Sequence, residues 1–124
     1  MKKNEIELFI KVQSQLEGMY NEVSALSKKS KDDALNEFKL NFVNNLLEEA
    51  NHLLKENYKP FKNFVKFEQD KIPTNSDVVM ILSQYLACFE NMRIDNIRRD
   101  INVWYWNLDD KKIKIRTNQP KRFS

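Results

Sequence analysis

Apolar residues recur at alternating intervals of three and four positions along residues 5–27. The members of this row are Phe9, Val12, Leu16, Met19, Val23 and Leu26. Such spacing places all of them on one face of an α-helix, as in a coiled-coil seam. Gly18 lies off this face and costs about 1 kcal/mol relative to alanine, so we expect one helix that continues through it.

A second and wider apolar pattern occupies residues 31–57. One row consists of Leu35, Phe38, Phe42, Leu46, Ala50 and Leu53, and Val43, Leu47 and Leu54 widen it. Ser30, three residues before Asp33, resembles a capping box, so the second helix is predicted from about Lys31 to Asn57, before Pro60. A face this broad is typical of a helix that touches two neighbours.

The third helix is predicted to follow an aromatic connector at residues 60–73. Thr74, Asn75 and Ser76 are good N-cap residues, and Asp77 suits the first helical turn. Apolar residues then follow with helical spacing at Val78, Leu82, Tyr85, Phe89 and Met92. The helix is expected to reach at least Arg99 and to end near Asn102.

Residues 103–117 allow two interpretations. Ile97, Ile101, Trp104 and Leu108 keep a helical spacing, which would extend the third helix to about Asp109. Strand-forming residues dominate 103–106, and residues 113–117 alternate with period two across a plausible turn at 109–110. We favour the β-hairpin. Because an isolated hairpin is marginally stable in water, it would have to pack on the helices or on a partner.

The expected fold is therefore mainly α. It is an up-down bundle of three long helices with a short aromatic connector and a small C-terminal β-hairpin and basic tail. Residues 1–102 would form the helical bundle. Residues 103–124 would form the hairpin and tail, packed on that bundle or extending from it.

The composition agrees with one domain that has a real core. The chain has 124 residues, of which 41% are hydrophobic and 31% charged, and this length is typical of a single domain. The longest apolar runs are far short of the roughly 20 residues of a transmembrane helix, and the N-terminal segment lacks the apolar stretch of a signal peptide. Cys88 is the single cysteine, in apolar surroundings, which favours a structural thiol and a cytoplasmic protein.

The sequence offers little for catalysis or cofactor binding. One glycine excludes glycine-rich phosphate loops, and one histidine leaves the Glu49–His52 pair without the second such pair that a di-iron bundle needs. We predict a protein that is not an enzyme, with no catalytic residue, metal or cofactor. A carboxylate-only metal site is the remaining alternative. Its residues would be Glu17, Glu22, Glu48, Glu90 and Asp95.

The C-terminal part combines aromatic and basic residues. Trp104, Tyr105 and Trp106 are the predicted anchors for a protein partner, because aromatic residues are enriched in interfaces. Basic groups beside aromatics also suit phosphates and stacked bases. The predicted nucleic-acid contacts are Arg93, Arg98, Arg99, Lys111, Lys112, Lys114, Arg116, Lys121 and Arg122.

Two functions follow. The first is a small non-enzymatic accessory subunit that binds a protein partner, or a second copy of itself, through helix faces and the aromatic-basic C-terminal region. The alternative is a nucleic-acid-binding accessory protein that uses residues 93–122.

Overall fold

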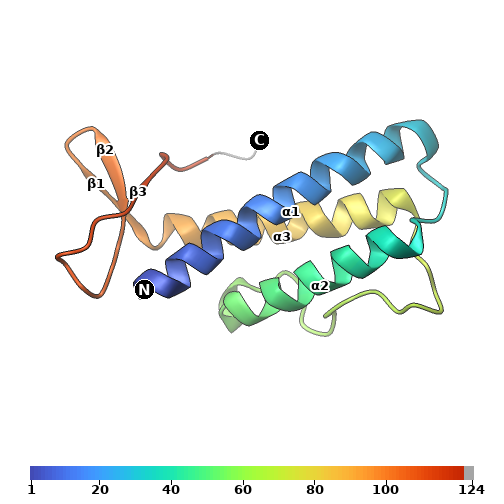
Figure 1. Ribbon diagram of the computed structural model, residues 1–124, viewed down its shortest axis with the longest axis horizontal. Helices are drawn as coiled ribbons and strands as arrows, with labels where there is room; N and C mark the ends of the chain where they lie inside the picture. Colours follow the sequence, from blue (N-terminus) through green and yellow to red (C-terminus); the bar gives the residue numbers. More distant parts are fainter. Residues whose placement is uncertain (122–124) are drawn as a thin grey trace.

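Three helices and a small antiparallel sheet make up the structure, a computed structural model that describes residues 1–121 (Figure 1). The elements are α1 (Lys3–Ser30), α2 (Glu37–Leu53), η1 (Glu56–Tyr58), α3 (Asn75–Ile94), β1 (Ile97–Asp100), β2 (Val103–Trp106) and β3 (Arg116–Thr117). The predicted fold, mainly α with a C-terminal hairpin, is confirmed. None of the helices in this part of the chain combines the length and apolarity that a bilayer crossing requires.

α1 runs in one direction, and α2 and α3 both run in the opposite direction, because the connector returns the chain to the start of α2 (Figure 1). α1 and α3 lie side by side, and α2 flanks them (Figure 1). The starts of α2 and α3 are joined, because the backbone N–H of Leu35 donates to the carbonyl of Pro73 (3.0 Å). The connector therefore runs back along α2. There Asn44 exchanges two hydrogen bonds with the backbone of Phe67, at 2.9 and 3.0 Å.

The boundary between the first two helices differs from the prediction. α1 continues through Ser30, so Ser30 does not cap the second helix. α2 instead begins after Asn36, whose side-chain oxygen accepts from the backbone N–H of Lys39 at 2.8 Å. α2 also ends at Leu53, earlier than expected. Asn36 supplies the capping oxygen that the prediction assigned to Ser30.

α1 packs as its apolar row predicted. Phe9, Val12, Leu16 and Val23 are fully buried. The ring of Phe9 stacks on Phe89 of α3 with 4.8 Å between centroids, and meets Trp106 of β2 edge-on at 5.3 Å. One aromatic side chain thereby joins both long helices to the sheet.

α2 buries only one side of its broad apolar face. Its buried residues are Leu40, Val43, Asn44, Leu47 and Ala50. Phe38 and Phe42, from the first row, are instead 72% and 50% exposed. The core contacts therefore use one side of the broad apolar face and leave the other side open.

The end of α3 and the first strand were not predicted. α3 ends at Ile94, where the side chain of Asn96 donates to the carbonyl of Met92 at 2.7 Å. Residues 97–100, expected to be helical, form β1 and pair with β2. The predicted pairing between residues 103–106 and 113–117 is present in part, since Trp104 faces Thr117 and Tyr105 faces Arg116.

A buried ion pair attaches the C-terminal segment to α3. Arg93 donates two hydrogen bonds to the Glu90 carboxylate, at 2.6 and 2.7 Å. It also donates to the Thr117 hydroxyl and to the carbonyls of residues 118 and 119, at 2.8–2.9 Å. Glu90 in turn accepts from the backbone N–H of Lys121 at 2.8 Å. All five donors of the guanidinium are used, so this pair determines where residues 117–121 lie.

The same hydrogen bonds set the protonation of Glu90. Burial by itself raises the pKa of this carboxyl. The hydrogen bonds from Arg93 and Lys121 and the charge of Arg93 outweigh burial, so the pKa lies below its ordinary value of 4.5. Because the pKa is lower in the folded state, the resulting stabilisation is present above pH 4.5 and is lost as pH falls through the folded-state pKa.

Replacing Glu90 by glutamine tests this ion pair. Glu90→Gln leaves a buried guanidinium without its counter-charge, so the free energy of unfolding at pH 7 should fall by about 3–5 kcal/mol. Urea denaturation followed by circular dichroism measures it. The variant should also lose less stability than the parent below pH 4.5. Glu17→Gln, in an exposed pair with Lys121, is the control and should cost under about 1 kcal/mol; equal losses would contradict the assignment.

The turn between β1 and β2 contains a strained residue. Ile101 has a φ of 58° and is 83% exposed. A β-branched side chain is unfavourable at positive φ, whereas asparagine is tolerated there. Ile101→Asn should therefore raise the free energy of unfolding by about 1 kcal/mol, measured by urea denaturation. Ile101→Val retains the branched carbon and should leave stability unchanged. A destabilised asparagine variant would show that the turn is unstrained.

Candidate functional site

A groove opens at the sheet end of the molecule. Its volume is about 1270 Å³. The end of β1, the β1–β2 turn, parts of β2 and β3, and the segment 118–121 form its walls. The lining residues are Arg99, Asn102, Val103, Trp104, Arg116, Thr117, Asn118, Gln119, Pro120 and Lys121. We call this the sheet groove.

The sheet groove is positively charged. Arg99, Arg116 and Lys121 line it, and no carboxylate does. Within residues 1–121, neither arginine forms an ion pair. Lys121 lies 3.5 Å from Glu17, with both side chains about half exposed. Exposed pairs of this kind contribute little energy, so Lys121 can leave Glu17 for another anion at small cost.

The two aromatic residues at the centre of β2 point to opposite faces of the sheet. Trp104 lies across from Arg99 and Thr117 and lines the sheet groove. Tyr105 and its cross-strand partner Arg116 lie on the other face, because side chains alternate along a strand and paired residues share a face. Arg116 therefore borders the sheet groove from the edge strand β3. The ring of Tyr105 is contacted by Arg98 at 5.3 Å and Lys114 at 5.6 Å. Both faces therefore carry cations beside an aromatic ring.

The remaining predicted binding residues lie elsewhere. Trp106 is 2% exposed and belongs to the core, so it is not a surface anchor. Arg93 is buried, and its donors are used by the ion pair with Glu90. Lys111 and Lys112 are exposed between β2 and β3 and do not line the sheet groove. Arg122 falls outside the described residues.

The acidic residues considered for a metal site are dispersed. Each binds a different partner, and residues 1–121 contain no cluster of three or more metal-ligating side chains. The pairs are Glu17–Lys121, Glu22–Lys39, Glu48–Lys66, Glu90–Arg93 and Asp95–Tyr58.

Cys88 and the Glu49–His52 pair occupy different environments. Cys88 is half-buried against the core, and burial raises the pKa of its thiol. A thiol that resists ionisation suits a structural role better than a reactive one. Glu49 and His52 both lie exposed on α2.

A second surface feature was missed by the sequence analysis. The rings of Phe38 and Phe42 contact each other edge-to-face at 5.0 Å on the open side of α2. We call this pair the α2 aromatic face. The sequence carries two signals for this surplus, the unusual width of the apolar pattern on α2 and the large number of aromatic residues for one three-helix core.

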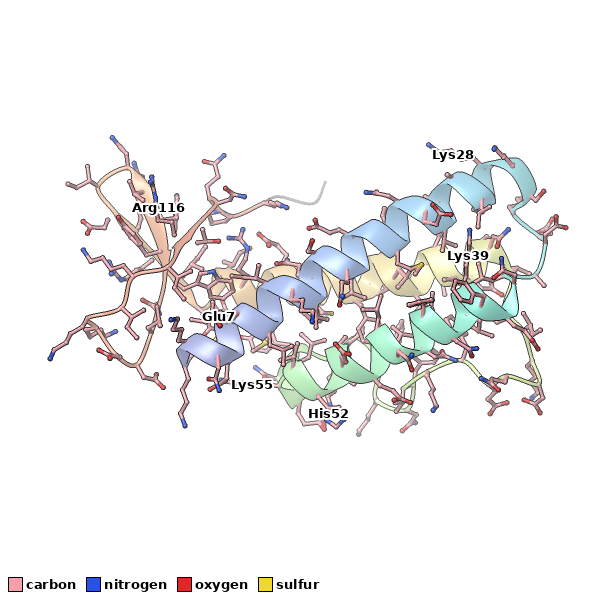
Figure 2. The ribbon with its side chains drawn as sticks, viewed as in Figure 1. Glu7, Lys28, Lys39, His52, Lys55 and Arg116 are labelled. Carbon is pink, nitrogen blue, oxygen red and sulfur yellow. The ribbon has the colours of Figure 1, made fainter. Side chains whose placement is uncertain are left out.

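The sheet groove and the α2 aromatic face lie at opposite ends of the molecule. Figure 2 shows Arg116 at the sheet end and Lys39, which follows Phe38 in the chain, near the far end of the bundle. Comparison with known protein families, with curated proteins and with solved structures finds no match. The two surfaces must therefore be interpreted from their own residues.

Proposed function

We propose that this protein is a non-enzymatic accessory subunit that binds a protein partner through the α2 aromatic face. The observation that carries the proposal is the exposure of Phe38 and Phe42, at 72% and 50%. Two adjacent phenylalanine rings left in water are costly, and exposed apolar patches often mark protein interfaces.

The shape of this face indicates the kind of partner it fits. Phe38 and Phe42 are one helical turn apart and form a ridge along α2. Aromatic ridges of this type insert into an apolar groove or pack against the apolar stripe of another helix. A partner surface that supplies such a groove or stripe, including one on a second copy of this chain, would remove both rings from water.

The rest of the molecule supports a binding role. The acidic residues are dispersed in separate pairs, and the single histidine is exposed on α2. Trp104 and Tyr105 remain candidate secondary contacts for a partner, whereas Trp106 serves the core. The inferred compartment is the cytoplasm, for which the lone Cys88 is the argument.

Substituting both rings tests the proposal. Phe38→Ser with Phe42→Ser should abolish association while changing the free energy of unfolding by under about 1 kcal/mol, because exposed side chains contribute little to folding. Light scattering coupled to size-exclusion chromatography measures self-association. Affinity capture from source-cell extract, followed by reconstitution with the purified partner, measures association with another protein.

Met80→Ser is the matched control, since Met80 is an exposed apolar residue on α3. The control should bind as the parent does. A doubled mass that becomes single in the phenylalanine variant identifies a second copy as the partner. A parent that is monomeric and associates with no protein, or a partner retained by the double variant, would refute the proposal.

A further inference from the structure

The sheet groove is a second binding surface, separate from the α2 aromatic face. Its volume of about 1270 Å³ exceeds the roughly 300–1,000 Å³ of pockets that hold one small molecule. It is an open groove lined by a turn, parts of three strands and an extended segment. These dimensions suit a length of polymer better than a single compact ligand.

The charge of the groove points to an anionic occupant. Residues 97–121 contain seven basic and three acidic residues, a net charge of +4. Arg99 donates to the carbonyl of Ile101 at 2.7 Å and to the side-chain oxygen of Asn102 at 3.2 Å. These two acceptors hold the guanidinium of Arg99 at the β1–β2 turn, and because both are neutral they leave its positive charge in place. Arg116 is exposed and unpaired among residues 1–121, so both arginines are available to an anion.

The groove also contains an aromatic ring and side-chain amides, which can bind uncharged parts of a ligand. Trp104 is half-buried between cross-strand partners Arg99 and Thr117, so its ring is held in place. A nucleobase can stack on such a ring. The side chains of Asn102, Asn118 and Gln119 are exposed in the groove and carry both donors and acceptors, as the edges of unpaired bases do.

One wall of the groove is held in position before any ligand arrives. The carbonyls of residues 118 and 119 accept from Arg93, and the N–H of Lys121 donates to Glu90. A wall that is already ordered reduces the entropy lost on binding.

From these observations we propose that the sheet groove binds a short length of single-stranded nucleic acid. One base stacks on Trp104, with phosphates against Arg99 and Lys121, and the strand passes Arg116 at the β3 edge of the groove. An acidic polypeptide would satisfy the cations but would leave the aromatic ring and the side-chain amides without a matching function. A duplex keeps its bases paired and offers no free base to the ring.

Fluorescence anisotropy with a labelled mixed-sequence 12-nucleotide strand, DNA or RNA, tests the proposal. Arg99→Gln with Arg116→Gln should weaken binding about tenfold or more, because each substitution removes a charge-assisted hydrogen bond to phosphate. The slope of log affinity against log salt should decrease by about 1.4, or about 0.7 for each phosphate that is no longer neutralised. Arg116→Gln alone should show half of that change in slope and leaves the β1–β2 turn intact.

The matched control removes the same charge from elsewhere. Lys28 and Lys55 are exposed and distant from Arg116 in Figure 2. Lys28→Gln with Lys55→Gln should change affinity by less than about twofold. Trp104→Leu should weaken binding roughly 5- to 150-fold, because the base no longer stacks on an indole ring. Circular dichroism confirms that each variant is folded.

Competition distinguishes the class of ligand. A duplex of the same length and poly-glutamate should each compete much less well than the single strand. No binding by the parent at low salt, equal competition by poly-glutamate or duplex, or equal weakening by the two double variants would overturn the proposal. The phenylalanine double variant should bind the strand normally, so failure here is distinct from failure of the proposed protein interface.

Discussion

The buried pair of Glu90 and Arg93 is the interaction that holds the C-terminal segment, residues 117–121, against α3. A guanidinium with five donors is stable inside a protein only where every donor finds an acceptor. Here the acceptors come from α3, β3 and the segment 118–121. The helix bundle, the third strand and the groove wall are therefore held by one network, and disruption of that network would affect folding and binding surface together.

Exposed apolar surface is distributed unequally between the two ends of the molecule. At the sheet end, Phe9, Phe89 and Trp106 pack against one another and leave the polar groove outside. At the other end, α2 has more apolar width than α1, α3 and the connector cover. The two proposed ligands, a protein partner at α2 and an anionic strand at the sheet, would therefore not compete for space.

The sequence predicted correctly those elements whose pattern of apolar residues allowed only one interpretation. The row from Phe9 to Val23 matches a single helix face, and the structure buries it there except for Met19, which is half-buried against the core. α2 had two overlapping apolar rows, and local periodicity alone does not tell which row faces the core, because that depends on the position of α1 and the connector. The sequence did not predict β1, because Arg98 and Arg99 are not typical strand residues and Ile97 and Ile101 continue the helical spacing of α3. In the structure, residues 97–100 pair with β2 instead of extending the helix.

The arginines of the C-terminal region show a second limit of sequence analysis, because the sequence lists basic residues without showing which of them are exposed. Arg93, Arg99 and Arg116 belong to the same basic region, but Arg93 is structural while the other two are exposed. A local signal separates them: Glu90 stands three residues before Arg93, between the buried Phe89 and Met92, so both charges lie beside apolar residues of one helix face. Neither Arg99 nor Arg116 has an acid at that spacing on a helix. An arginine with a carboxylate one helical turn away, among core residues, is best assigned to the interior before it is counted in a nucleic-acid surface.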